Sequence, residues 1–290
     1  AYYESLRIKP TLRTMFYRLF SKGIIRNTVY DYRNMSGKTA RAREASIQNT
    51  KSHWGLLDID CFADNSRTST RFQSEIYYWK PEDKVSGYVK NLQELPSIYQ
   101  KEILPRWVDQ PHYVEIWTEK AAMVGTFQQL LDDRQVAIVP FGGFHSVSYL
   151  WENAKILKYF QQLGKKIHIL YFGDFDPTGM VIEKTLKNKL SYYGLKNVDW
   201  KRIGVTYQQM EDFDLPKKVD AATYKKLENH QEIDEFKKKY GGLYQIEVDA
   251  LPALRPEEFR NMVIDSVDQY FNEEIYNRVL EKYSEEYVQQ

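Results

Sequence analysis

Short β-rich runs alternate with helix-length segments over residues 112–206. The runs are YVEIW, VAIVPF, KIHILYF and KRIGVT. Strands that alternate with helices predict a parallel sheet with helices on its faces, because each crossover has to carry the chain back to the same end of the sheet. We therefore expect an α/β fold in this part of the chain, with functional side chains at the carboxyl ends of its strands.

Acidic residues follow two of these predicted strands. Glu119 comes directly after the first, and Asp174 and Asp176 follow the third, within LYFGDFDPTG. Residues two apart in extended backbone point the same way, so both aspartates can reach one cation. The sequence holds a single cysteine, which excludes a multi-cysteine zinc site and an internal disulfide within it. Oxygen ligands favour Mg²⁺ or Mn²⁺, and such an ion also stabilises charge on a phosphate oxygen.

The same acidic segment also fits two roles besides metal binding. Asp176 can cap a helix that begins near Pro177 or Thr178, and this role is compatible with metal binding. Asp174, Asp176 and Thr178 also match the Asp-x-Asp-x-Thr motif of haloacid-dehalogenase-like phosphatases. That resemblance implies that Asp174 attacks phosphorus and that Asp176 acts as acid or base. The motif normally opens its fold, whereas two strand-helix units precede it here.

The first 50 residues are basic. They hold ten Lys or Arg against three Asp or Glu, although the net charge of the whole chain is +1. We expect one helix from about Thr11 to Gly23 and another that opens at Asn27 or Thr28, together a helix-turn-helix or winged-helix-like unit. The candidate DNA-contacting side chains are Arg33, Lys38, Arg41 and Arg43, with Lys120 from the sheet. A helical hairpin with a solvated basic face would give the same pattern.

A strand that ends in Glu119, a second strand with a Gly-Gly exit and a third that ends in Asp174-x-Asp176 together resemble the Toprim domain. This domain occurs in topoisomerases, primases and related nucleases. The resemblance implies that Glu119 is a general acid or base and helps to hold metal. It also implies that the two aspartates bind magnesium and that Gly179 shapes the following turn.

Two further segments, TEKAAM and TLRTMFYRL, resemble the A subunit of topoisomerase VI and the meiotic double-strand-break transesterase. This resemblance implies that Tyr17 attacks a DNA phosphodiester and leaves a 5′-phosphotyrosyl bond, assisted by Arg13 one helical turn earlier. Phe16 stands where that family has its first tyrosine. Tyr17 also suits a buried core position in an amphipathic helix, so both interpretations stay open.

The expected activity is Mg²⁺-dependent DNA cleavage, either by transesterification through Tyr17 or by hydrolysis at the same metal site. A homodimer is expected, because a double-strand cut needs two active centres, and the topoisomerase VI resemblance raises a separate ATPase subunit as a further partner. The segments QMEDFDLP and YQIEVDALP are similar to uncharacterised prokaryotic proteins that join such a helical unit to a Toprim domain. A non-catalytic DNA-binding protein is the alternative outside the enzymes.

The chain is predicted to divide into a basic DNA-binding unit at 1–50, a connecting region at 51–111, a Toprim metal-binding domain at 112–250 and an acidic helical segment at 251–290. One helix is expected from about Pro256 to Tyr287. Glu247 and Asp249 alternate on a predicted strand, where they face solvent or add a carboxylate to the metal site.

The sequence also bears on location. No run approaches the roughly 18 apolar residues of a membrane span, and the sequence does not begin with the pattern of a signal peptide. We expect no membrane contact and a cytoplasmic location, associated with the nucleoid if the protein is prokaryotic.

Overall fold

The computed structural model of the chain describes residues 12–47, 55–62, 106–142, 146–215, 217 and 230–288. The side chains of Arg13, Thr14, His230 and 282–288 lie outside this description. So does most of the predicted connecting region 51–111. The chain divides into two compact units. One comprises residues 1–68, 144–159 and 188–195, and the other 69–143, 160–187 and 196–290.

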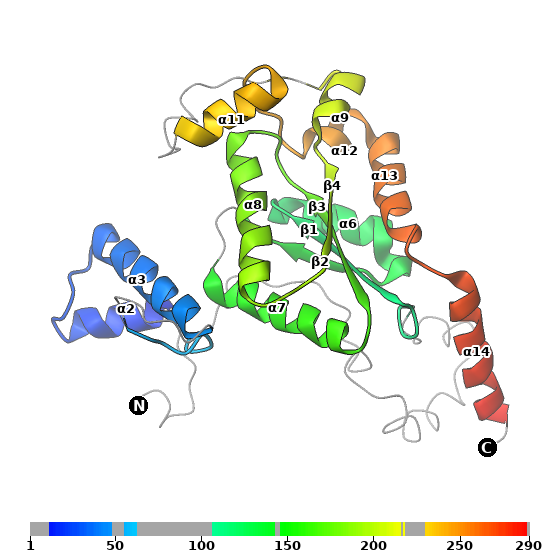
Figure 1. The fold of residues 1–290 in the computed structure, drawn as a ribbon, viewed down its shortest axis with the longest axis horizontal. Coiled ribbons are helices and arrows are strands. Elements are labelled where there is room, and N and C mark those ends of the chain that lie inside the picture. The colour runs from blue at the N-terminus through cyan, green and yellow to red at the C-terminus, as the bar shows by residue number, and fades with distance from the viewer. Residues whose placement is uncertain are drawn as a thin grey trace. The chain divides into compact units, whose positions relative to one another are not determined.

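The second unit is built on a four-stranded parallel sheet (Figure 1). Its strands are β1 (His112–Thr118), β2 (Ala137–Pro140), β3 (Lys166–Phe172) and β4 (Asp199–Gly204). All four predicted strands are confirmed, and β1, β2 and β3 are almost wholly buried, as expected for parallel strands that are covered on both faces. The α/β class is therefore confirmed, while the more specific Toprim arrangement stays a prediction.

The strand order is β2-β1-β3-β4. From β1 the chain passes to β2 on one side and then to β3 on the other side of β1, so the connections diverge between β1 and β3. Thr118 pairs with Phe172 at the last position of both strands, so the two strands end level with each other. In open α/β sheets, ligands bind outside the carboxyl ends of the strands at such a switch point.

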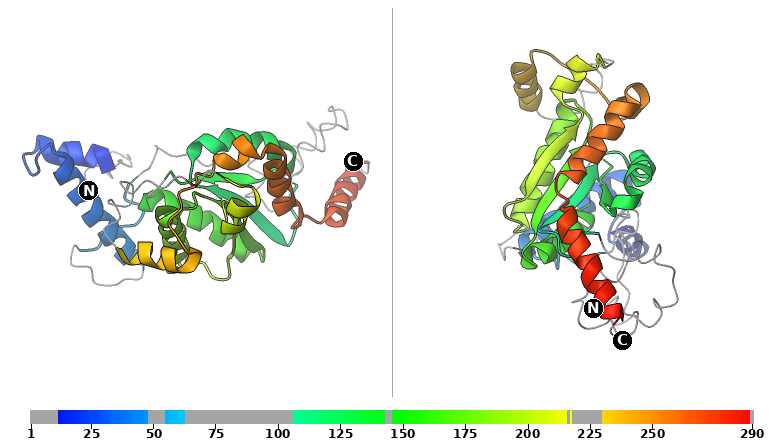
Figure 2. Two further views of the ribbon diagram at one scale, coloured as in Figure 1. Left: turned by 90° about the horizontal axis from the view of Figure 1, so that it is seen from above. Right: turned by 90° about the vertical axis from the view of Figure 1, so that its right-hand side faces the viewer.

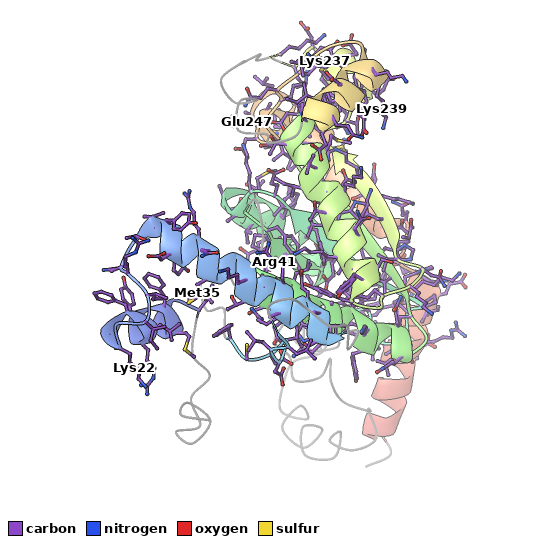
Figure 3. All side chains as sticks on the ribbon, turned by 60° about the vertical axis from the view of Figure 1, so that its left-hand side comes forward. Lys22, Met35, Arg41, Lys237, Lys239 and Glu247 are labelled. Atoms are coloured by element: carbon purple, nitrogen blue, oxygen red, sulfur yellow. The ribbon has the colours of Figure 1, made fainter. Side chains whose placement is uncertain are left out.

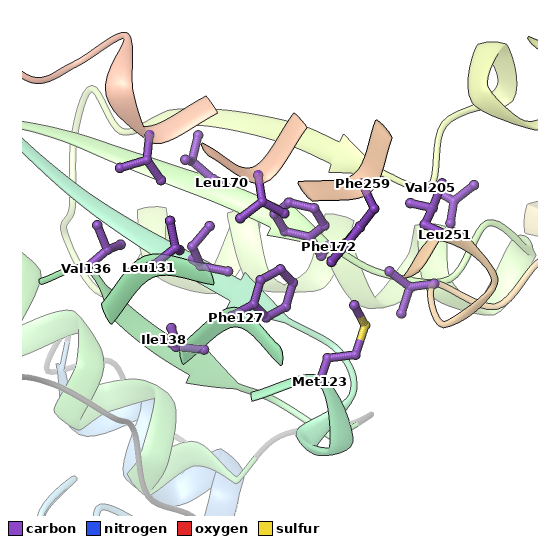
Figure 4. Packing of buried hydrophobic residues seen from close by; sticks show 14 of the residues in the cluster. Met123, Phe127, Leu131, Val136, Ile138, Leu170, Phe172, Val205, Leu251 and Phe259 are labelled. Carbon is purple, nitrogen blue, oxygen red and sulfur yellow. The ribbon is translucent and has the colours of Figure 1, made fainter. Parts of the chain in front are cut away.

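Helices α6 (Val124–Leu131), α12 (Ala250–Leu254) and α13 (Pro256–Asp268) cover one face of the sheet (Figures 1 and 2). The core between them includes Phe127 of α6, whose ring lies 4.8 Å from that of Phe172 and 5.8 Å from that of Phe259 (Figure 4). Full burial of each such side chain stabilises the fold by about 1.5–3 kcal/mol. This packing fixes β3, and with it the residues that follow β3.

The opposite face carries the first part of α8 (Pro177–Tyr192). Glu183 of this helix is 4% exposed and accepts a hydrogen bond from Trp200 Nε1 at 2.9 Å. It also pairs with Arg202 and with Lys187, each at 2.6 Å. Burial alone would raise the pKa of Glu183, but these two cations hold it below its usual range. The buried ion pair therefore ties α8 to β4.

Arg202 also holds the carboxyl end of β3. Its Nη2 donates to the carbonyl oxygens of Gly173, at 2.9 Å, and of Asp174, and its Nε donates to the carbonyl oxygen of Val205 at 2.7 Å. One guanidinium thus satisfies three backbone carbonyls just where β3 and β4 end. The backbone that carries Asp174 is fixed by these bonds.

The remaining elements of this unit are short turns and outer helices. They are the 3₁₀ turns Ala121–Met123 and Asp132–Arg134 and the helices α9 (Tyr207–Asp212), α11 (His230–Tyr240) and α14 (Glu273–Val288).

The predicted single helix from Pro256 to Tyr287 is wrong, because α13 and α14 are separate helices. Asn272 lies between them, and the Gln110 side chain binds its backbone twice. Gln110 Nε2 donates to the Asn272 carbonyl oxygen, and the Asn272 N–H donates to Gln110 Oε1, both at 2.8 Å. These bonds engage backbone groups that a continuous helix would have paired internally.

The first unit contains the predicted helix pair, α2 (Leu12–Ser21) and α3 (Val29–Ile47), with most of α7 (Val147–Gln162) and the end of α8. Gly23, at φ +68°, follows the end of α2, and Thr28 Oγ1 caps α3 by accepting from the Asp31 N–H at 3.0 Å. Both boundaries agree with the prediction. All regular structure described in this unit is helical, so the two helices are confirmed and a winged helix stays a prediction.

We expect Glu183→Ala to destabilise the protein by about 3 kcal/mol, because it leaves Arg202 buried without its carboxylate partner. The free energy of unfolding, measured by urea denaturation at pH 7, checks this. The matched control is Glu211→Ala, which removes an exposed ion pair to Lys217 and should cost less than about 1 kcal/mol. Equal losses in the two variants would contradict the structural role of Glu183.

Candidate metal centre at the carboxyl end of the sheet

Glu119 and Asp174 meet at the switch point between β1 and β3. The Glu119 N–H donates to the Phe172 carbonyl oxygen at 2.9 Å, which continues the strand pairing by one residue. Its side chain then turns to the end of β3, where Glu119 Oε2 accepts from the Asp174 N–H at 3.2 Å. The structure thus brings together two side chains that are 55 positions apart in the sequence.

Asp176 belongs to the same group and also caps α8. It is 6% exposed, and its Oδ1 accepts from the Gly179 N–H at 2.6 Å. The predicted capping role is therefore confirmed. A Cβ atom at Gly179 would overlap the carbonyl oxygen of Asp174, so only glycine allows the helix to begin this close to the preceding loop.

All three carboxyl groups are shifted toward their neutral forms. Burial, reinforced by the charges of Asp174 and Asp176, raises the pKa of Glu119 to about 7. Burial also raises the pKa values of Asp174 and Asp176, although hydrogen bonds from backbone N–H groups act in the opposite direction. Ionising the whole group is therefore unfavourable until a cation offsets its charge.

The donor atoms here are carboxylate oxygens, the type of ligand that a hard divalent cation prefers. Within the described ranges, the Glu119 side chain accepts a hydrogen bond through Oε2 and the Asp174 side chain through Oδ1. Glu119 Oε1 and Asp174 Oδ2 accept none in these ranges. Mg²⁺ is usually bound through one or two carboxylates and keeps several waters, and Mn²⁺ shares its preference for oxygen ligands. In the same ranges, no three Asp, Glu, His or Cys side chains already have the arrangement that a bound metal would need. The residues that would hold the ion are Glu119, Asp174 and Asp176.

Lys120 faces these acidic residues. Its Nζ lies 2.8 Å from Glu247, 2.9 Å from Asp249 and 3.6 Å from Asp174. Burial alone would lower the pKa of Lys120, but the hydrogen bonds to Glu247 and Asp249 raise it, so the ammonium stays charged. Lys120 is a predicted DNA contact, and in this structure its charge is engaged by three carboxylates.

Glu247 and Asp249 do not lie on a strand, contrary to the prediction. Only Ile246 pairs there, in an isolated antiparallel bridge with Phe175, and the chain then turns into α12. Glu247 is labelled in Figure 3. The bridge holds this segment next to the loop that carries Asp174, so both acidic residues reach Lys120.

The other predicted DNA contacts lie on α3, in the first unit. Arg33 and Arg41 are exposed, Lys38 is partly buried, and Arg41 is labelled in Figure 3. Arg43 is only 5% exposed, and its guanidinium donates to the Ser148 hydroxyl at 2.6 Å and to a backbone carbonyl. The prediction that Arg43 lies on a DNA-contacting surface is therefore wrong, because its guanidinium is buried and bound to groups of the protein itself.

Tyr17 is 46% exposed, whereas Phe16 beside it is 3% exposed and packs edge-on against Tyr32 with the ring centres 5.1 Å apart. The core position in this helix thus belongs to Phe16, and the interpretation of Tyr17 as a buried residue is wrong. Arg13 lies one turn earlier in α2, but its side chain is outside the described residues. An exposed phenol is the accessible form that a nucleophile requires.

Sequence reasoning missed two polar residues beside the carboxylates. One is Arg202, whose charge inside the predicted strand KRIGVT is the signal that could have revealed it. The other is Tyr171, which is 0% exposed and whose hydroxyl has no hydrogen-bond partner among the described residues. Burial raises the pKa of Tyr171 well above its ordinary value, and the charge of Glu119 adds to this.

Comparison with protein-family models and with curated proteins found no match for this chain. Among the described helices, none is long and apolar enough to cross a membrane.

The raised pKa of Glu119 predicts how stability changes with pH in the metal-free protein. At Glu119 the folded state binds more protons than the unfolded state between pH 4.5 and about 7, so the contribution of this group to stability should fall as pH rises through this range. Glu119→Gln removes the contribution of Glu119 to the pH dependence and should be more stable than the wild type by about 2–3 kcal/mol at pH 8. Chemical denaturation with EDTA present, at pH 5 and pH 8, provides the measurement.

The control for this prediction is Glu258→Gln, an exposed position on α13. It should follow the wild-type pH dependence. A Glu119→Gln protein that is less stable than the wild type at pH 8 would show that Glu119 stabilises the fold instead of straining it.

Proposed function

We propose that this chain is an enzyme that cleaves DNA with Mg²⁺ or Mn²⁺ held by Glu119, Asp174 and Asp176. The observation that carries the proposal is the gathering of these three buried carboxyl groups at the end of β1 and β3, where burial and the charges of neighbouring carboxylates raise their pKa values. Retaining such groups together is unfavourable unless a cation offsets them. A phosphodiester is the substrate class that needs such a cation, because its oxygens carry negative charge.

The residues of the site would have different roles in the proposed reaction. The bound ion would act as a Lewis acid on a phosphate oxygen. Glu119, with a pKa of about 7, is suited to accept or return a proton near neutral pH. Asp176 contributes one oxygen to the α8 cap, so the amino end of that helix, with its partial positive charge, begins beside one of the three carboxyl groups.

The proposal includes two sources of the attacking oxygen. In transesterification the Tyr17 phenolic oxygen bonds to phosphorus while the bond from phosphorus to the 3′ oxygen breaks. The phenol gives its proton to a base, and the leaving 3′ oxygen takes one up. The exposure of Tyr17 supports this route, since the nucleophile has to reach DNA. In hydrolysis a water attacks instead, and no protein-DNA bond forms.

A plasmid cleavage assay with Mg²⁺ or Mn²⁺ tests the proposal. Protein attached to the 5′ ends supports transesterification by a topoisomerase VI-like protein, and free ends support a hydrolytic nuclease. Binding without cleavage would identify a non-catalytic DNA-binding protein. Dephosphorylation of a small phosphate ester without action on DNA would favour the haloacid-dehalogenase-like phosphatase.

Asp174→Asn should reduce cleavage by about 100-fold or more, because the charge that holds the cation is lost. The amide oxygen can still accept from the Val248 N–H, which is 2.8 Å from Asp174 Oδ1, so the fold and DNA binding in a gel-shift assay should persist. Asp265→Ala, an exposed position on α13, should cleave as the wild type does. Full activity of Asp174→Asn would reject the metal site.

Tyr17→Phe should abolish the covalent protein-DNA product, because the attacking hydroxyl is absent. The product is measured on denaturing gels, with and without prior protease digestion. Tyr30→Phe is the control, since Tyr30 is an exposed tyrosine on α3 and its loss should leave the product unchanged. Undiminished cutting by Tyr17→Phe would leave only the hydrolytic route.

A further inference from the structure

Tyr171 shares one face of the sheet with Glu119. Trp117 pairs with Tyr171 and Thr118 with Phe172 in the β1-β3 register, so Glu119 follows β1 level with Gly173. Side chains two apart on a strand point to the same face, which puts 117, 119, 171 and 173 together. Glu119 and Tyr171 are therefore neighbours across the two strands, with Gly173 between them.

The Tyr171 hydroxyl occupies space that is open because residue 173 is a glycine. A Cβ atom at Gly173 would lie 2.6 Å from the Tyr171 hydroxyl oxygen and 2.6 Å from Cε1 of its ring. The tyrosine thus extends along β3 toward the carboxyl end and occupies the space that a side chain at 173 would fill. Trp200, with its ring centre 5.3 Å away, and the guanidinium of Arg202, 5.5 Å from the ring centre, pack against it.

This fixed hydroxyl has no hydrogen-bond partner among the described residues although it is fully buried. Tyr113, on the same face of β1, is the ordinary case, because its hydroxyl donates to Glu115 Oε1 at 2.8 Å. A buried hydroxyl without a partner destabilises the protein that contains it. A phenylalanine at 171 would keep the packing and avoid this cost.

We propose that the Tyr171 hydroxyl donates a hydrogen bond to an oxygen bound at the carboxylate site, either a water of the metal ion or an oxygen of a phosphate. The inference rests on the proposed function, since it assumes that the site binds a cation. It assigns to the site a neutral donor in addition to its three acidic groups. Such a donor orients the bound oxygen and leaves the negative charge that holds the cation unchanged.

The test compares Tyr171→Phe with Tyr113→Phe in the full chain. In EDTA, the melting temperature of Tyr171→Phe should equal or exceed that of the wild type, because no hydrogen bond is lost. Tyr113→Phe should melt at a lower temperature, because it loses the bond to Glu115. Isothermal titration with Mn²⁺ alone, and with Mn²⁺ plus inorganic phosphate, should then give Tyr171→Phe a dissociation constant about 10-fold weaker than the wild type in at least one arm.

The outcomes separate this inference from the proposed function. A weaker constant with Mn²⁺ alone identifies a metal-bound water as the acceptor, and a weaker constant only with phosphate present identifies the phosphate oxygen. Wild-type affinity of Tyr171→Phe in both arms, or a lower melting temperature in EDTA, would overturn the role of Tyr171 and leave the metal site standing. A wild-type protein that binds no Mn²⁺ would overturn both.

Discussion

The parallel pairing of β1 with β3 is the constraint from which the candidate site follows. The two strands end level, at Thr118 and Phe172, so the residues after them have to share one small region. Backbone hydrogen bonds set this register, and the aromatic core behind β3 keeps it from shifting. A displacement by one residue would send Glu119 to the other face of the sheet, because side chains alternate. The position of the acidic group is thus determined mainly by the pairing of the strands and less by the loops that follow them.

Opposing charges divide the surroundings of the site into two systems. Arg202 and Glu183 neutralise each other inside the fold and fix the end of β3. Lys120 gathers Glu247 and Asp249, so these carboxylates already have a cation. Glu119, Asp174 and Asp176 accept hydrogen bonds from backbone N–H groups, and Lys120 reaches only Asp174 among them, at 3.6 Å. The strain is thereby concentrated on three oxygen-bearing side chains, which is the arrangement that a divalent ion relieves.

The sequence allowed the strands, the first two helices and the carboxylates at the strand ends to be predicted, because these depend on local pattern. Contacts between distant segments could not be predicted. Nothing local distinguishes Phe16 from Tyr17 as the core residue, and nothing in α3 indicates that Arg43 would turn inward to Ser148. The unpaired hydroxyl of Tyr171 was hidden for the same reason, since β3 predicts its burial but not the absence of a partner. The role of Gln110 depends on Asn272, 162 positions away.

Gln110 binds the backbone just before α14 in the way that a neighbouring strand binds the edge strand of a sheet. Its amide has the same donor and acceptor as a peptide group, and it meets the backbone of Asn272 with both. The backbone just before α14 is thus held by a residue that precedes β1. Shortening the protein from its amino end therefore affects its carboxyl end, because a fragment that begins at β1 would lose the side chain that binds the backbone between α13 and α14.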